Sequence, residues 1–383
     1  MLFLVVITAF FIVLFGMPTL IKVARAKGLM DLPEDPRKIH KRAVPTVGGV
    51  MIFAALLFNV FFWLAVGPAP ATAVFQAGSA LAACSVIIFF MGLKDDIVGL
   101  APTKKLLVHL AVGILLVTVG GYRIETFGGL FGIEELPEGL AMVFSLFVYI
   151  VVVNALNLID GVDGLAGGYT VIAMSAFAFW FLNTGQIPDA VIALTMAGAM
   201  LGFLVFNFAP ARIFLGDSGS LLTGLIAYGL ATHVINTPQS LVPEAWAGIS
   251  KPVIAMSILA YPLLDTLRVF CLRAARGMSP FSPDRNHLHH RLMMQTRSHT
   301  KTAVFVYIFS LGMVCIAMAR PYLFPQVGEE GMFFGLFALS FIWFIPILNS
   351  TRGQHKLAQH RDQLLRDAIE QNKGKRAAES AVA

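Results

Sequence analysis

Residues 140–158 read LAMVFSLFVYIVVVNALNL, an uncharged stretch that ends on two asparagines, and residues 159–164 continue as IDGVDG. A helix that spans a bilayer needs about 20 mostly apolar residues. In hydrocarbon the backbone must satisfy its own hydrogen bonds, so the stretch is interpreted as a helix rather than a strand. It therefore predicts a membrane-spanning helix whose polar end reaches one membrane surface.

Ten further stretches resemble this one, and together they predict an all-α polytopic membrane protein with about 11 transmembrane helices. Apolar residues make up 57% of the 383 residues and charged residues 13%, about half the usual quarter, which excludes an ordinary soluble enzyme. Three cysteines form no disulfide framework. The predicted spans are 2–21, 46–66, 72–93, 106–121, 140–158, 168–183, 189–208, 220–237, 249–271, 302–319 and 332–349.

The basic residues predict the orientation of these helices. Twenty-five of the 28 Lys and Arg fall in five segments, namely 22–45, 94–105, 209–219, 268–301 and 350–383. Because cytoplasmic loops are enriched in Lys and Arg, the N-terminus is predicted to be periplasmic and the C-terminus cytoplasmic. The net charge of +6 then reflects orientation and anionic headgroups rather than nucleic-acid binding. We expect one membrane domain at 1–350, with a retained N-terminal anchor, and a polar cytoplasmic tail at 351–383.

Short polar motifs gather on the predicted cytoplasmic face, which locates a predicted active site there. The first motif is Asp95-Asp96, followed by Lys105. Adjacent carboxylates raise each other's proton affinity, which suits a general base or a metal site. Since neighbouring residues of a helix point about 100° apart, one aspartate can bind a ligand while the other is held structurally.

The second and third motifs surround the remaining acids. Asn154, Asn157, Asp160 and Asp163 recur every three residues, so a continued helix would line their oxygens along one face, and Gly161 and Gly164 allow a sharp turn. In the motif 216–220 (Gly-Asp-Ser-Gly-Ser), Asp217 precedes the eighth predicted span, and Ser218 or Ser220 is predicted to cap that helix.

The fourth motif, Ser282-Pro-Asp-Arg-Asn-His-Leu-His-His-Arg291, lies in the longest basic loop. Arginine and histidine favour recognition of an anionic substrate, while zinc binding is the weaker alternative because no cysteine partner is present. Asp265 lies near the end of the ninth predicted span with Arg268 three residues on. A structural ion pair and a direct catalytic role remain open for it.

Carboxylate and amide oxygens at one membrane surface suit Mg²⁺ completed by substrate phosphates. No Walker A, kinase, Rossmann or G-x-S-x-G motif is present. The combination indicates phosphoryl transfer at the membrane. In their order, the four motifs resemble the polyprenyl-phosphate N-acetylhexosamine-1-phosphate transferase family (glycosyltransferase 4 family), and the span layout extends the resemblance over most of the chain.

Residues 277–285 resemble the bacterial branch that uses N-acetylglucosamine. The resemblance implies UDP-N-acetylglucosamine as donor, undecaprenyl phosphate as acceptor, and Mg²⁺ or Mn²⁺ as cofactor. The implied products are UMP and undecaprenyl-diphospho-N-acetylglucosamine, a starter lipid for O-antigen, and hence lipopolysaccharide, or related envelope glycans, made at the bacterial inner membrane. No nucleic-acid partner is expected, and a homodimer is left open.

The resemblance also implies residue roles. Asn157 and Asp217 would hold the metal, Asp95 or Asp96 would position or deprotonate the acceptor phosphate, and Lys105 would hold phosphate charge. Asp160 joins this catalytic group. The substrate-binding residues would be Asn154, Asp163, Gly164, Arg285, His287, His289 and His290, with Asp163 and its glycine turn on the uridine side and the Arg/His group closing over the sugar and diphosphate.

Three alternatives stay open from the sequence. The same reaction could use another UDP-N-acetylsugar, and it could pass through a covalent aspartyl-phosphate instead of direct attack. A cation-coupled transporter is the remote alternative, but it predicts polar residues along the membrane midplane rather than at one face.

Overall fold

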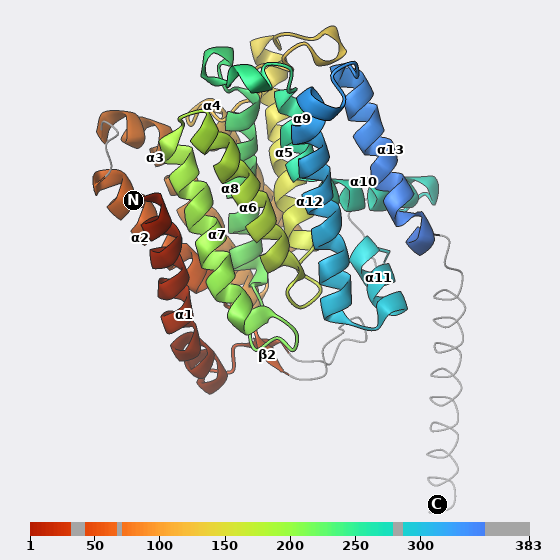
Figure 1. The fold of residues 1–383 in the computed structure, drawn as a ribbon. Coiled ribbons are helices and arrows are strands. Elements are labelled where there is room, and N and C mark those ends of the chain that lie inside the picture. Colours follow the sequence, from red (N-terminus) through yellow and green to blue (C-terminus); the bar gives the residue numbers. More distant parts are fainter. Residues whose placement is uncertain (32–42, 67–70, 279–285, 349–383) are drawn as a thin grey trace, which may run out of the picture.

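The protein is a bundle of helices, shown as a computed structural model in Figure 1. The structure describes residues 1–31, 43–66, 71–278 and 286–348, without the side chains of 71–77 and 348. The predicted tail at 351–383 and Arg285 lie outside the described residues. The helices are α1 (Leu2–Ala26), α2 (Gly49–Val66), α3 (Ala71–Val98), α4 (Pro102–Thr118), α5 (Glu138–Leu158), α6 (Leu165–Asn183), α7 (Ile187–Asn207), α8 (Gly216–Ile235), α9 (Lys251–Ile258), α10 (Ala260–Ala275), α11 (Leu288–Thr296), α12 (His299–Leu323) and α13 (Glu329–Leu348).

Eight helices in the described part of the chain are long and apolar enough to cross a membrane, namely α1, α2, α5, α6, α7, α8, α12 and α13. The bent pair of α9 and α10 raises the number to nine if it counts as one span. The mostly helical, polytopic architecture is therefore confirmed. Each of the eleven predicted ranges overlaps a helix, but α3 and the 17-residue α4 are not among these candidates. The count of eleven and the orientation stay predictions.

The predicted span 249–271 is wrong as a single straight helix. The chain breaks at Leu259, and α9 and α10 meet at 78°, so α10 lies across the bundle in Figure 1. Pro262 in the first turn of α10 has no N–H to donate to the carbonyl of Ile258. The hydroxyl of Tyr169, on α6, donates to that carbonyl instead, at 2.9 Å. Proline and a partner from another helix together explain the break.

Helix α8 is the centre of the bundle, with 17 of its 20 residues buried. Small residues let other backbones approach it closely, as is common where helices pack in membranes. A Cβ on Gly49 of α2 would lie 2.3 Å from the amide nitrogen of Gly219, and one on Gly92 of α3 would lie 2.6 Å from that of Ser218. On the far side, a Cβ on Gly224 would lie 2.7 Å from the Cα of Val153 in α5.

One end of the bundle carries β1 (Met30–Asp31) and β2 (Val44–Pro45), which pair antiparallel. The chain after β2 then binds the segment that leads into α8. The Phe214 amide donates to the carbonyl of Pro45 at 2.7 Å, and the Gly48 amide donates to that of Phe214 at 3.0 Å. Short 3-10 turns η1 (Leu130–Gly132), η2 (Gln239–Leu241) and η3 (Glu244–Trp246) complete the described elements. In Figure 1, β2 marks the lower end, where the polar motifs also meet.

The close approach at Gly92 predicts that alanine substitution affects stability differently at two helical glycines, Gly92 and Gly312. Gly92→Ala should lower stability by about 1–3 kcal/mol, because the new methyl group overlaps the backbone of α8. Gly312→Ala, in α12, meets nothing within 4 Å and should leave stability unchanged or slightly raised, since alanine favours a helix. Thermal unfolding of the purified protein in detergent measures both. Equal midpoints for the two variants would contradict the close packing of α3 on α8.

Candidate active site

A cavity of about 470 Å³ opens where the polar motifs meet. Its walls come from the start of α8, the end of α3, the loop after α5, the segment around β1 and β2, and the start of α12. The lining residues are Met30, Asp31, Thr46, Asp95, Asp96, Asp160, Gly161, Val162, Asp163, Asn207, Phe214, Gly216, Asp217, His290 and His299. Motifs that are far apart in the sequence therefore share one cavity.

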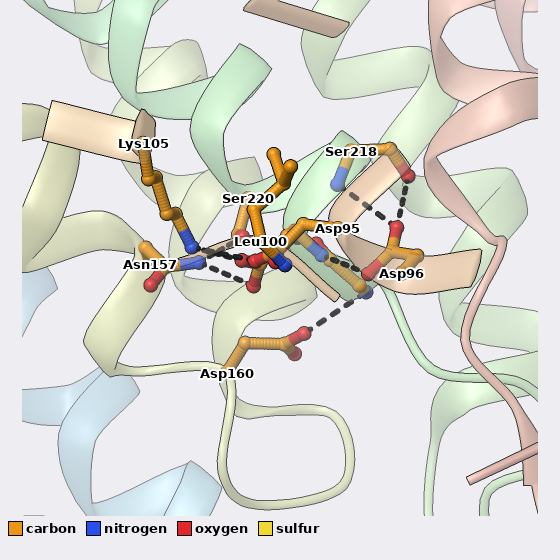
Figure 2. Close-up of polar contacts among 10 residues, drawn as sticks. Asp95, Asp96, Leu100, Lys105, Asn157, Asp160, Ser218 and Ser220 are labelled. Carbon is orange, nitrogen blue, oxygen red and sulfur yellow. Dashed lines mark hydrogen bonds and ion pairs between the residues drawn. The ribbon is translucent and has the colours of Figure 1, made fainter. Parts of the chain in front are cut away.

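Asp96 caps the N-terminus of α8 from the neighbouring helix α3 (Figure 2). Its carboxylate accepts hydrogen bonds from the Asp217 amide at 2.7 Å, the Ser218 amide at 3.0 Å and the Ser218 hydroxyl at 2.7 Å. The predicted cap by Ser218 or Ser220 is wrong, because α8 begins at Gly216 and both serines lie inside it. Burial raises the pKa of Asp96, which lies beyond the apolar part of α3, to about 7, against the opposing effect of these hydrogen bonds.

Asp95 points to a different partner from Asp96. Its Oδ2 accepts from the Lys105 ammonium at 2.9 Å, and its Oδ1 accepts from the Leu100 amide at 2.6 Å. The same ammonium also contacts Asp217, so one positive charge lies between two carboxylates. The Asn157 amide donates to Asp217 Oδ1 at 2.9 Å and to Ser220 Oγ at 2.8 Å. These contacts join Lys105, Asp95, Asp217 and Asn157 in one polar cluster, of which Figure 2 labels Lys105, Asp95 and Asn157.

The second motif, in which polar residues recur every three positions, is helical only as far as the end of α5. Asn154 donates to the carbonyl of Ile150 in its own helix and does not line the cavity, so its substrate contact stays a prediction. Helix α5 ends at Leu158, and Asp160 therefore lies in the loop, where its Oδ2 accepts from the Gly216 amide at 3.2 Å. Burial, together with the nearby charge of Asp217, raises the pKa of Asp160 well above its usual value.

The turn at Asp163 and Gly164 is held from three sides. Gly164 has a φ of +78°, which explains the glycine. Its amide donates to Asn207 Oδ1 at 2.9 Å, and its carbonyl accepts from the Tyr307 hydroxyl. Asp163 Oδ2 accepts from the Ala211 amide at 3.0 Å. Asp163 therefore lines the cavity from a turn that several hydrogen bonds hold, and Gly164 belongs to that turn without lining the cavity itself.

His299, the first residue of α12, is a cavity residue that the sequence analysis missed. The Asp163 amide donates to its Nδ1 at 3.0 Å, across 136 positions of sequence. A single histidine before an apolar stretch carries no motif, so only the packing of α12 against this turn reveals it.

The histidine motif divides between the cavity and the interior. His290 lines the cavity, whereas His287 and His289 are buried, and their predicted contact with substrate stays a prediction. Asp265 of α10 accepts from the Leu288 amide at 2.8 Å and lies 3.1 Å from His287 Nδ1 and 3.5 Å from His289 Nδ1. The expected pair with Arg268 is present at 3.6 Å. Asp265 thus joins α10 to the start of α11.

The comparisons with known proteins agree with this arrangement. The family model described as glycosyl transferase family 4 matches residues 79–235. The chain is 30% identical to decaprenyl-phosphate N-acetylglucosaminephosphotransferase of Mycobacterium tuberculosis, over 90% of this chain and 89% of that protein. This chain belongs to glycosyl transferase family 4.

Two further relatives carry the name undecaprenyl-phosphate alpha-N-acetylglucosaminyl 1-phosphate transferase. The Yersinia pestis protein is 30% identical over 87% of this chain and 88% of its own length. The Escherichia coli protein is 29% identical over 84% of this chain and 83% of its own length. As a member of glycosyl transferase family 4, the chain is a multi-pass membrane enzyme of the transferase class.

The contacts of Asp265 predict a local effect of its amide variant. Asp265→Asn removes one acceptor oxygen from the Leu288 amide and His287, so the start of α11 should open more often. Hydrogen exchange should rise by about 3- to 10-fold at the first amides of α11. Asp189→Asn is the matched control, because Asp189 pairs with His233 outside the cavity and α11. Unchanged exchange in α11 of the Asp265 variant would contradict the role.

Proposed function

We propose that the protein transfers N-acetylglucosamine 1-phosphate from UDP-N-acetylglucosamine to undecaprenyl phosphate, releasing UMP and undecaprenyl-diphospho-N-acetylglucosamine. The names of the relatives support polyprenyl-phosphate acceptors and N-acetylglucosamine phosphate transfer. The observation that carries the proposal is the Lys105 ammonium between the carboxylates of Asp95 and Asp217, in a cavity at one end of a membrane bundle. This cluster suits a diphosphate with a divalent cation.

The oxygen atoms of the cluster fit Mg²⁺, with Mn²⁺ as a substitute. Asp217 offers a carboxylate, and the amide oxygen of Asn157 accepts no hydrogen bond from the described residues. No group of three or more His, Cys, Asp or Glu side chains within the described ranges is placed to hold a metal. Mg²⁺ commonly uses one or two carboxylates and completes its shell with water and substrate phosphates. We therefore propose Asp217 and Asn157 as the protein ligands.

The remaining residues then have distinct tasks in the reaction. Bound Mg²⁺ would neutralise charge on the donor diphosphate. Lys105 would supply a second positive charge to the phosphates, and Asp95 would hold the Lys105 ammonium in place. Asp96 keeps the first turn of α8, and with it Asp217, in position. Because the acceptor phosphate already carries negative oxygens, its attack on the sugar-bearing phosphate needs little base catalysis.

The position of the cavity favours transfer over transport. The acids of the described cavity come from one end of the bundle, whereas a transporter would place polar sites near the midplane, reachable from both faces. The same cavity is compatible with another UDP-N-acetylsugar, which makes donor preference part of the test. We place the enzyme in the bacterial inner membrane, where its product would start O-antigen or a related envelope glycan.

Purified protein, labelled UDP-N-acetylglucosamine, undecaprenyl phosphate and Mg²⁺ should yield label in the lipid fraction and an equal amount of UMP. Omitting Mg²⁺ or adding a chelator should abolish the transfer, and Mn²⁺ should restore part of it. UDP-N-acetylgalactosamine serves as the competing donor. If labelled UDP-N-acetylglucosamine leaves the lipid fraction unlabelled, the proposed reaction is wrong. If only labelled UDP-N-acetylgalactosamine labels the lipid, the donor is that other UDP-N-acetylsugar.

Removing the charge of Asp217 should abolish turnover without unfolding the protein. Asp217→Asn keeps the size of the side chain but weakens both the cation site and the contact with Lys105, so kcat should fall at least about 100-fold. Raising Mg²⁺ should recover part of the loss if affinity for the cation is affected. Asp189→Asn is again the control and should keep kcat within about 2-fold. Full activity of Asp217→Asn would exclude Asp217 from the cation site.

A further inference from the structure

His299 presents one unused hydrogen-bond donor to the cavity. Both of its contacts with described residues involve Nδ1, which accepts from the Asp163 amide and lies 3.4 Å from Asp163 Oδ1. A neutral imidazole that accepts at Nδ1 carries its proton on Nε2. The side chain is 20% exposed and lines the cavity, and Nε2 has no partner in the part of the chain that the structure describes.

His299 is not needed merely to hold the turn beside it. Three other contacts fix that turn, from the Ala211 amide, from Asn207 and from the Tyr307 hydroxyl. The Asp163 amide needs only an acceptor atom at the position of Nδ1. A shorter side chain without an imidazole ring could supply that atom. Among the described residues, none therefore accepts the Nε2 proton, and holding the turn does not require it.

The surroundings of His299 indicate the chemistry of its ligand. Asp163 and Asp31 also line the cavity, and carboxylates beside the site disfavour a phosphate that lacks its own cation. An uncharged acceptor fits better, such as a carbonyl or hydroxyl oxygen. The nucleotide-sugar donor carries such oxygens on its uridine half and on its N-acetylsugar half.

We propose that His299 is a donor-binding residue whose Nε2–H donates a hydrogen bond to an uncharged oxygen of the nucleotide sugar. The inference rests on the proposed function, because it takes the donor to be a uridine-diphosphate sugar. It adds α12, which lies outside the residues matched by the family model, to the substrate-binding surface.

Two amide variants separate donor binding from support of the turn. The side-chain amide of asparagine reaches about as far as Nδ1, and that of glutamine about as far as Nε2. His299→Asn keeps an acceptor for the Asp163 amide and loses the donor in the cavity, whereas His299→Gln does the reverse. We expect His299→Asn to weaken binding of UDP-N-acetylglucosamine about 3- to 10-fold, the effect of one neutral hydrogen bond. His299→Gln should stay within about 2-fold of the unchanged protein.

Equilibrium titration of the full chain in detergent, without acceptor lipid, measures this binding independently of turnover. Thr300→Ala is the control, because Thr300 is the exposed neighbour on α12 and does not line the cavity. Parallel titration with UMP locates the contact. Weaker UMP binding by His299→Asn assigns the uridine half, and unchanged UMP binding with weaker donor binding assigns the sugar half.

The opposite result would be normal donor binding by His299→Asn and weakened donor binding by His299→Gln. It would show that His299 only supports the turn and would overturn the proposal. Normal binding of both ligands by both variants would overturn it as well. Failure of the proposed function is recognised separately, since it requires that the unchanged protein transfers no N-acetylglucosamine 1-phosphate to undecaprenyl phosphate. The titrations test His299 wherever the unchanged protein binds UDP-N-acetylglucosamine, because they need no transfer to the acceptor.

Discussion

The first turn of α8 packs directly against the backbones of α2 and α3, and the geometry of the candidate active site depends on this contact. Gly49 and Gly92 bring the two helices close enough to touch the backbone at Ser218 and Gly219. The same approach brings Asp96 to the free amides of Asp217 and Ser218. These amides lie in the first turn of α8 and have no intrahelical acceptor, and their hydrogen bonds are partly buried, so leaving them unpaired would be costly. Packing and capping thus fix the position of the Asp217 carboxylate.

The sequence predicts best those features that depend on local composition. The apolar ranges locate the helices because span length is set by bilayer thickness, and each of the four motifs contributes at least one residue to the cavity lining. The expectation that one of two adjacent aspartates binds while the other is held structurally agrees with the different partners of Asp95 and Asp96. The sequence does not decide which aspartate has which role, because Lys105 and the amides of Asp217 and Ser218 reach them from other helices.

Features that depend on tertiary contacts were missed or misplaced. The sequence favours Ser218 or Ser220 as the cap of α8, because a capping side chain normally comes from the start of the helix itself, whereas Asp96 reaches the first amides from α3. The break between α9 and α10 requires Pro262, which was visible in the sequence, and also Tyr169 from α6, which was not. The importance of Asp265 likewise depends on α10 turning back toward α11, where amide and imidazole groups offset the cost of burying its charge.

The participation of α12 has a consequence for how the enzyme is made. The match to the family model ends at residue 235. The turn that follows α5 is nevertheless held by Tyr307 and His299, which are synthesised more than 130 residues after it. The acids of the first three motifs are therefore synthesised before the α12 residues that hold this turn. A nascent chain stalled after α8 would carry the carboxylates and Lys105 but lack part of the cavity.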